Sequence, residues 1–360
     1  MKLQDKVIWI ISPEPWGEQM LSKHHYAAEL ARRGNEIIFI EPFYNGTLLK
    51  EVPEHPGVRL LPWKPFRGLR KIPHVIARQM QKREMLKISA LTGSRPDVIW
   101  SFDNSRLFDL NVLGEEVLTI HHMVDLNQDF EVARAASSAE LCLATTRFIK
   151  KRLSKYNTHS FNIGHGCDVR KVREWTPHDG PIRIVYTGNL LIPLLDQDRI
   201  LAAVDRFPQA EFFFVGSYQK GKLNRRVRKE GEAFIEALRS HENVTLTGPL
   251  IGPEYHEILA SADLFILGYD PRHYEQVANP HKIPELLNTG RVIISNVLDS
   301  YVDLGMVEMS DDKEVWLEMI SSAIEHIADY NTPHLQSKRK AWAEKHSYER
   351  QVNHIETLIP

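Results

Sequence analysis

Cysteine is nearly absent from this sequence of 360 residues, which contains only Cys142 and Cys167. Two cysteines are too few for the disulfide framework of a small secreted protein, and their spacing is not one that holds a metal ion. The sequence therefore predicts a protein of a reducing compartment.

An excess of charge of one sign is also missing. The chain carries 45 lysines and arginines against 47 acidic residues, which gives a net charge of -2. Proteins that bind nucleic acid through its phosphates present a strongly basic surface. We therefore expect no nucleic-acid partner.

Long hydrophobic runs are the third absence. The longest, such as Val7 to Ile11 and Phe212 to Val215, fall far short of the roughly 20 residues that a helix needs to cross a bilayer. The first run is also too short for a signal-peptide core, and no small-residue cleavage site follows it. The sequence predicts a cytoplasmic protein that reaches a membrane only peripherally, at its inner face.

What the sequence does contain is a regular alternation of short apolar runs and helical patterns, which is typical of parallel sheets with crossover helices. The charged stretch Arg173 to Gly180 interrupts the alternation near the middle. We predict an α/β protein with two doubly wound domains, at 1–172 and 173–332, and C-terminal helices at 333–360 that return to the first domain. The predicted strands are 7–11, 36–40, 98–102, 117–120, 141–145, 182–186, 212–215, 244–247, 264–267 and 292–295.

The segment most informative about function is 277–295, VANPHKIPELLNTGRVIIS, which indicates a loop, a helix, a tight turn and a strand. Ligands of open parallel sheets bind beyond the carboxyl ends of strands, and a helix start attracts phosphate. Asn279 and Pro280 lie at such a start, where the helix dipole disfavours Lys282 unless an anion is bound. Glu285, on nearly the same helix face, is placed to accept hydrogen bonds from two ribose hydroxyls. The alternative is an ordinary surface ion pair between Lys282 and Glu285.

This segment resembles the donor-binding segment of GT-B glycosyltransferases, especially those of bacterial cell-surface polysaccharides. Further stretches occur in the order of that family: PDVIWSFD (96–103), LCLATTRFIKKRLSKY (141–156), IGHGCD (163–168), IVYTGNL (184–190), FFFVGS (212–217), ENVTLTGPL (242–250) and ASADLFILGYDP (260–271). The chain looks similar to glycosyltransferase family 4-like enzymes and to the xanthan-pathway glucuronosyltransferase. The resemblance implies the GT-B fold, two Rossmann-like domains facing a central cleft, and a nucleotide-sugar donor with a sugar or lipid-linked acceptor.

The donor side is expected to include a set of loop and helix-start residues: Gly17, Gly188, Asn189, Tyr269, Asn279, Pro280, His281, Lys282 and Glu285. The sequence departs from the family at three points. Only Glu285 matches the two glutamates of the commonest retaining subgroup, and His165 stands where asparagine is commoner. The loop after Tyr186 lacks the Arg and Lys pair that often binds the diphosphate, so Lys282 is expected to bind it largely alone.

In the first predicted domain, TIHHMVD (119–125) follows a strand. Inverting transfer needs a base for the acceptor hydroxyl, and a carboxylate or histidine at a strand end can act as one. We expect Asp125 to be this base, in a position that resembles the catalytic aspartate of the glucuronosyltransferase; the alternative is a helix cap. His121 and His122 alternate along an extended backbone, and we expect His122 to point toward the cleft as a second catalytic residue.

The loop and helix start at 13–25 are also expected to face the cleft, with Glu18, Ser22, His24 and His25 on the acceptor side. An exposed loop that is polar only because it is solvated is the alternative. Gly17 would let the backbone approach a ligand closely. The 17 histidines show no HExxH spacing, so we expect no metal and no cofactor.

The segment Trp63 to Lys87 mixes apolar and basic side chains. Basic charge beside apolar anchors suits an anionic membrane surface, which would be a further partner. An ordinary amphipathic helix is the equal alternative. Two other functions remain open at this point: a nucleotide-sugar 2-epimerase, and a non-catalytic nucleotide-sugar-binding subunit of a polysaccharide assembly complex.

Overall fold

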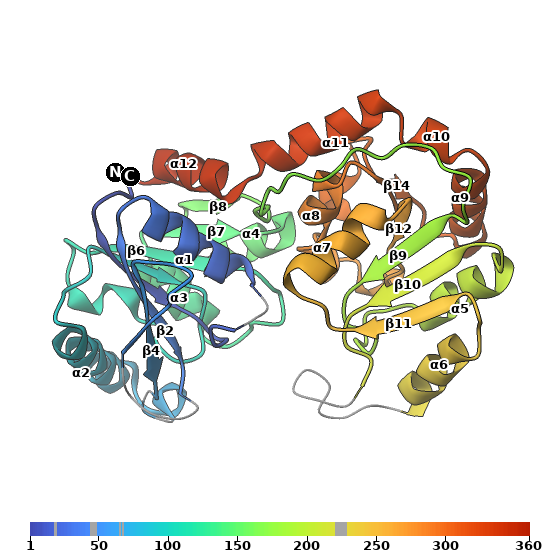
Figure 1. The fold of residues 1–360 in the computed structure, drawn as a ribbon. Helices are drawn as coiled ribbons and strands as arrows, with labels where there is room; N and C mark the ends of the chain where they lie inside the picture. Colours follow the sequence, from blue (N-terminus) through green and yellow to red (C-terminus); the bar gives the residue numbers. More distant parts are fainter. Residues whose placement is uncertain (18–19, 44–48, 65, 67, 220–228) are drawn as a thin grey trace. The chain divides into compact units, whose positions relative to one another are not determined.

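The computed structural model describes residues 1–17, 20–43, 49–64, 66, 68–219 and 229–360. These residues form two compact units (Figure 1), which we call unit 1 (Met1–Gly166 with Tyr348–Pro360) and unit 2 (Cys167–Ser347). The sequence placed the boundaries at 172 and 332. In the structure, the chain returns to unit 1 only after Ser347. The reason is that α11 (Pro333–Lys345) packs on α8 (Ile283–Asn288) of unit 2, whereas α12 (Tyr348–Leu358) packs on α1 (Ser22–Arg32) of unit 1.

Unit 1 is built on a sheet whose described strands follow the order β3-β4-β2-β1-β5-β6-β7-β8, with every neighbouring pair parallel except β3 and β4. The strands are β1 (Val7–Ile11), β2 (Glu36–Pro42), β3 (Lys50–Glu51), β4 (Val58–Trp63), β5 (Val98–Ser101), β6 (Leu118–Met123), β7 (Leu141–Ala144) and β8 (Ser160–Asn162). The remaining helical elements are η1 (Leu69–Lys71), α2 (His74–Thr92), η2 (Leu110–Leu113), α3 (Val132–Ser138) and α4 (Arg147–Leu153).

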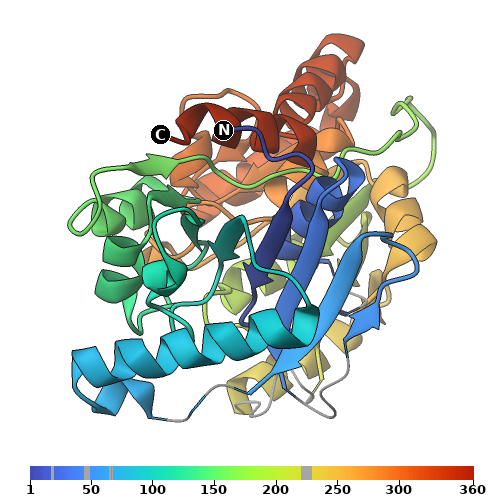
Figure 2. The same cartoon turned by 90° about the vertical axis from the view of Figure 1, so that its left-hand side faces the viewer.

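Alternate residues of the central strand β1 enter different cores of unit 1. Ile8 and Ile10 pack with Tyr26 of α1 and Val352 of α12, whereas Trp9 lies in the core that includes residues of α2, α3 and α4. Such two-sided burial explains why the central strands are continuous apolar runs, as in parallel sheets covered on both faces. Figure 2 shows α2 in front of the sheet of unit 1.

Unit 2 has a second sheet, in which the described strands are all parallel and follow the order β11-β10-β9-β12-β13-β14. Its strands are β9 (Arg183–Thr187), β10 (Glu211–Val215), β11 (Val244–Gly248), β12 (Leu264–Ile266), β13 (Val292–Ser295) and β14 (Glu308–Met309). Besides α8 and α11, its helical elements are α5 (Gln197–Arg206), α6 (Lys229–Arg239), α7 (Gly252–Ser261), η3 (Pro271–His273), η4 (Asp299–Tyr301), α9 (Lys313–Glu325) and α10 (Ile327–Tyr330).

The predicted fold class is confirmed, since each unit holds a doubly wound parallel sheet. The sequence missed β4, whose run VRLLPW ends with Pro62 and Trp63, because a proline argues against a strand. In the part of the chain that the structure describes, no helix has the length and apolar character needed to cross a membrane.

Candidate functional site

The first group of predicted site residues lies where β9 and β10 of unit 2 end. Gly188 follows β9 directly, and its N–H donates to the carbonyl of Val215 at 2.8 Å. Gly188 and Gly216 have φ angles of +138° and +147°, and a side chain on Gly216 would collide with the Gly188 backbone. A side chain on Gly188 would in turn meet the ammonium of Lys282. Glycine is therefore required at both positions by close approach of the chain.

Lys282 lies against these strand ends and is 8% exposed. Its ammonium donates to the carbonyl of Thr187 and lies 4.8 Å from the ring centre of Tyr186 and 5.9 Å from that of Tyr269. Burial lowers the pKa of Lys282 to about 7, although Glu285 acts in the opposite direction. A buried ammonium without a carboxylate hydrogen-bonded to it is costly, and an anion brought beside it would favour its charged form.

The helix that carries these residues begins later than the sequence indicated. α8 starts at Ile283 and Lys282 is the residue that flanks it, so Asn279 and Pro280 lie in the preceding loop and not at the helix start. The carboxamide oxygen of Asn279 accepts a hydrogen bond from the Tyr301 hydroxyl at 2.8 Å. Lys282 is thus at the helix start, but as the capping residue and not in the first turn, and its ammonium packs on Tyr186 and Tyr269.

Glu285 is half-buried and accepts a hydrogen bond from the Tyr255 hydroxyl at 3.0 Å. Burial raises the pKa of the Glu285 carboxyl, opposed by Tyr255, Arg170 and Lys282 and reinforced by Asp168. Glu285 also lines a cavity of about 610 Å³ in unit 2, together with residues of the chain after Cys167, of α7 and of α8. The lining includes Asp168, Arg170, Lys171, Arg173, Gly252, His256 and Asn288. The surface ion pair offered as the alternative is not formed, since Lys282 bonds to the Thr187 carbonyl instead.

The other donor-side residues lie in the same unit, apart from Gly17. Tyr269 is 4% exposed and donates its N–H to the side-chain oxygen of Asn296. The side-chain oxygen of Asn189 accepts the N–H of Leu191 at 3.0 Å, which fixes the turn after β9. His281 is exposed.

In unit 1, Asp125 lies two residues beyond the end of β6 and is exposed. Its carbonyl accepts the N–H of Gln128, and its carboxylate makes no hydrogen bond to the described residues. The next helix, α3, begins at Val132 and is flanked by Glu131, so Asp125 does not cap it. Desolvation by the surrounding protein raises the pKa of the Asp125 carboxyl, with Lys23 lowering it and Glu14 raising it.

His121 and His122 are both buried, at 0% and 1% exposure, because β6 continues through them to Met123. The His122 ring lies 4.7 Å from the Phe102 ring and 5.5 Å from that of Tyr26. Burial lowers the pKa of His122 well below its ordinary value. The expectation that His122 leaves the core is therefore wrong, and its imidazole is neutral.

The expected acceptor-side residues differ in their surroundings. Both ring nitrogens of His24 bond to backbone, since Nδ1 accepts the N–H of Leu21 at 2.8 Å and Nε2 lies 3.2 Å from the carbonyl of Pro15. Burial lowers the pKa of His24 to about 3, helped by the charge of Lys23. His24 therefore holds the start of α1, and the expectation that it lines an open acceptor site is wrong.

The remaining acceptor-side predictions lie near the same helix start. The Ser22 hydroxyl is 3.4 Å from Nδ1 of His165, and His25 stacks on Tyr348 with ring centres 4.7 Å apart. Gly17 is exposed, and a side chain there would meet no atom within 4 Å. Glu18 lies outside the described residues.

Sequence reasoning missed Lys23, which lies between two residues that it singled out. Lys23 is 3% exposed and forms an ion pair with Glu14. The sequence carries a signal for it, because the helix dipole disfavours a lysine in the first turn of a helix and Lys23 directly follows Ser22, where α1 begins.

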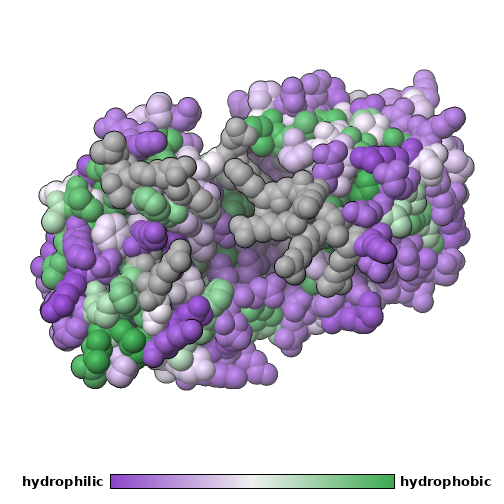
Figure 3. Space-filling view, turned by 90° about the horizontal axis from the view of Figure 1, so that it is seen from below, coloured by the Kyte–Doolittle hydropathy of each residue, from purple (hydrophilic) through white to green (hydrophobic). Residues whose placement is uncertain are grey.

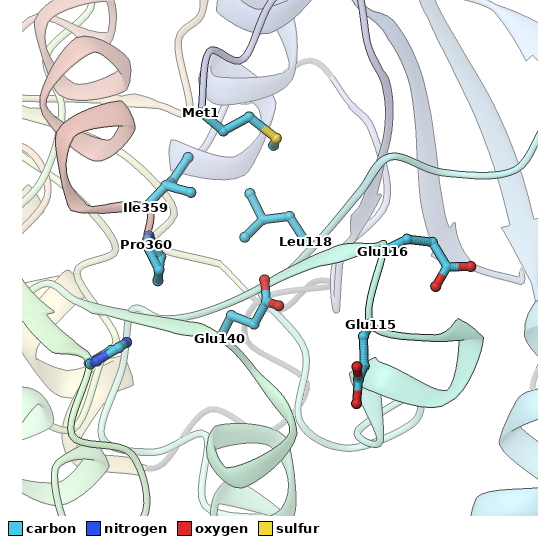
Figure 4. A pocket seen from close by; sticks show the side chains of 8 residues that line it. Met1, Glu115, Glu116, Leu118, Glu140, Ile359 and Pro360 are labelled. Atoms are coloured by element: carbon cyan, nitrogen blue, oxygen red, sulfur yellow. The ribbon is translucent and has the colours of Figure 1, made fainter.

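A second cavity, of about 380 Å³, lies at the amino end of the strands of unit 1 (Figure 4). Glu140 precedes β7 and Leu118 begins β6, and the lining includes the acidic residues Glu115, Glu116 and Glu140. Ligands of such sheets bind at the opposite, carboxyl edge. This cavity is therefore not the candidate site.

No protein-family model matches the sequence, and no curated protein matches it in sequence. Solved structures match over nearly the whole chain. Sucrose-phosphate synthase from Thermosynechococcus elongatus has a TM-score of 0.70 at 13% identity and covers 98% of both chains. A glycosyltransferase from Rickettsia africae has a TM-score of 0.70 at 12% identity, over 98% of this chain and 97% of the other. Anabaena HepE, in complex with UDP and glucose, has a TM-score of 0.66 at 14% identity, over 98% of this chain and 99% of the other. At these identities the likeness concerns the fold, and the chain has the GT-B fold of glycosyltransferases.

Proposed function

We propose that the chain is a glycosyltransferase that moves a sugar from a nucleoside-diphosphate sugar to a hydroxyl of a sugar or lipid-linked acceptor, in the synthesis of a cell-surface polysaccharide or glycoconjugate. The observation that supports this best is the buried ammonium of Lys282. It lies beside Gly188 at the carboxyl end of the sheet of unit 2, and it hydrogen-bonds to no carboxylate among the described residues. A diphosphate would supply the missing negative charge.

The donor site proposed here consists of the strand-end and loop residues of unit 2. Lys282 binds the diphosphate, and the Glu285 carboxylate, oriented by the Tyr255 hydroxyl, accepts hydrogen bonds from the ribose. The turns at Gly188 and Asn189 bring backbone close to the phosphates. Tyr269, Asn279, Pro280 and His281 complete the wall of the site.

The reaction proposed here inverts the anomeric centre. Asp125 takes the proton of the acceptor hydroxyl while that oxygen forms a bond to the anomeric carbon. The bond between the anomeric carbon and the diphosphate oxygen breaks, and the leaving oxygen takes the electron pair. Lys282 stabilises the charge that grows on the leaving diphosphate. A neutral His122, buried in β6, takes no proton in this scheme.

We also propose that the protein works at the inner, anionic face of a membrane. Helix α2 exposes Val75, Ile76, Leu86 and Leu91, and the exposed side chains of Lys82, Arg83 and Lys87 lie on the same helix. The face in Figure 3 is mostly hydrophilic with separate hydrophobic patches. Apolar anchors among basic residues match a surface of anionic lipid. Pro65 and Arg67 of this segment lie outside the described residues.

Incubation of the protein with a panel of UDP-, GDP- and dTDP-sugars, without acceptor, tests the proposed activity. A transferase is expected to hydrolyse its donor slowly and to release the nucleoside diphosphate. Formation of an isomeric nucleotide sugar would instead show a 2-epimerase, and binding without turnover would show a non-catalytic subunit. No binding of any member of the panel would contradict the proposal.

A further inference from the structure

Lys23 of unit 1 carries a buried charge that the reaction above does not use. Its side chain is 4% exposed, and its ammonium donates to the carboxylate of Glu14. No other acceptor for the ammonium is found among the residues that the structure describes. An ammonium removed from water needs an anionic partner, since a buried charge left unpaired strongly destabilises the folded state. Glu14, or an anion in its place, is therefore required.

The two members of this ion pair are buried to very different extents. The Glu14 side chain is 45% exposed, against 4% for Lys23. The backbone of Glu14 is fixed by Ser12, whose hydroxyl donates to the Glu14 carbonyl at 2.6 Å and accepts the Glu14 N–H at 3.2 Å. The Glu14 carboxylate can thus rotate into water about its own side-chain bonds while the loop stays in place. The Lys23 side chain, in contrast, is enclosed by protein at the start of α1.

The pair is also close to the candidate base. β1 ends at Ile11 and α1 begins at Ser22, so the segment holding Glu14 and the start of α1 lies at the carboxyl edge of the sheet, where ligands of such folds bind. Desolvation raises the pKa of the Asp125 carboxyl, and Lys23 is near enough to lower it. A group held by the ammonium would therefore lie near Asp125.

We propose that Lys23 is an anion-binding residue for the acceptor, and that Glu14 occupies its ammonium until a phosphate or carboxylate group of the acceptor replaces it. This inference rests on the proposed function, because it names the chemical class of the acceptor. The structural alternative is an ion pair that only fastens the loop to α1. The two explanations differ in the effect expected of Glu14: a competing anion weakens ligand binding, whereas a structural partner supports it.

The test uses the full chain with Lys282→Met as background, so that anion binding by Lys282 in unit 2 does not contribute. Pyrophosphate represents the phosphate source and glucuronate the carboxylate source, with glucose as the neutral control, and binding is measured by calorimetry. Glu14→Gln is expected to strengthen binding of at least one anion about tenfold, and Lys23→Met to weaken it about tenfold or more. Lys23→Arg keeps the charge and is expected to retain binding.

The matched control is the surface pair Arg206 of α5 and Glu314 of α9, which is held at 3.0 Å with side chains 42% and 71% exposed. Glu314→Gln and Arg206→Met are expected to change nothing. Tighter binding of pyrophosphate assigns a phosphate-bearing acceptor, and tighter binding of glucuronate assigns a uronate. Weaker binding in both Glu14→Gln and Lys23→Met, or no binding of either anion by Glu14→Gln, would overturn the proposal. Nucleotide binding by the wild-type chain is measured separately, so failure of the proposed function is recognised independently.

Discussion

The ammonium of Lys282 lies 4.8 Å from the centre of the Tyr186 ring and donates to the carbonyl of Thr187, 95 positions earlier in the chain. This relationship places a lysine whose pKa is lowered to about 7, by burial first of all, beside two closely packed glycine turns. Near neutral pH such a lysine gains or loses a proton easily. Binding and stability should therefore both depend on pH through this side chain.

Lys282→Met is expected to weaken binding of a nucleoside diphosphate by about 2 kcal/mol, the value of a charge-assisted hydrogen bond. A bound diphosphate favours the charged ammonium, so wild-type binding at pH 8 is also expected to take up protons. Calorimetry in buffers of different ionisation enthalpy measures both effects. Lys313→Met, at an exposed lysine of α9, is the control. Unchanged affinity in the Lys282 variant would remove this residue from the site.

The stability of the wild-type chain is expected to rise with pH between about 7 and 10.5 more steeply than that of Lys282→Met. In this window the unfolded lysine holds a proton that the folded one has lost, so the unfolding free energy rises by up to about 1.4 kcal/mol per pH unit. Below pH 7 both states are protonated and the difference between the proteins becomes constant. The measurement is the unfolding free energy of the two proteins in urea across this pH range. If the two free energies change with pH in parallel, the prediction is contradicted.

Glu285→Gln is expected to reduce nucleotide affinity while leaving the melting temperature nearly unchanged, because glutamine can still accept the bond from Tyr255. Tyr255→Phe, which removes only the orienting hydroxyl, should lower affinity less. Burial raises the pKa of Glu285, so affinity should also decline on acidification earlier than for an ordinary glutamate. A large loss of thermal stability without ligand would instead mark Glu285 as a structural residue.

Asp125→Asn is expected to lower turnover by about 10² to 10⁴, the usual contribution of a general base, with donor affinity near that of the wild type. Asp129→Asn is the matched control, since Asp129 lies in the same loop and is exposed, with its carboxylate bound by Arg152. Rate measurement is combined with determination of the product anomer. A product that keeps the donor's configuration would refute the base assignment whatever the rate.

The membrane proposal predicts flotation of the protein with anionic vesicles but not with neutral ones. Each basic residue near an anionic surface contributes about 1 kcal/mol, so Lys82→Glu with Arg83→Glu should reduce binding strongly. Added salt should weaken wild-type binding as well. Ile76→Ser removes an exposed anchor that is 53% accessible, and it should reduce binding without destabilising the fold. Equal recovery with both kinds of vesicle would count against the proposal.

The sequence predicted most of the buried strands because each is a continuous apolar run bounded by polar or turn residues. Val7–Ile11 and Val292–Ser295 match the predicted ranges exactly as β1 and β13. The end of β6 was placed three residues too early, at Ile120, because His121 and His122 are polar and their burial cannot be read from local pattern. The same cause explains the wrong expectation for His122.

By itself, then, the sequence determined two parallel sheets of the doubly wound kind, since apolar runs and breakers are local properties of the chain. Only the tertiary structure decided the charge and partners of the candidate site residues. The rings of Tyr186 and Tyr269 lie against the Lys282 ammonium, which is shielded from solvent. Lys23 is shielded from solvent where α1 packs on the rest of unit 1. The free energy of an ionised group depends on what surrounds it in space, and residues distant along the chain supply those surroundings.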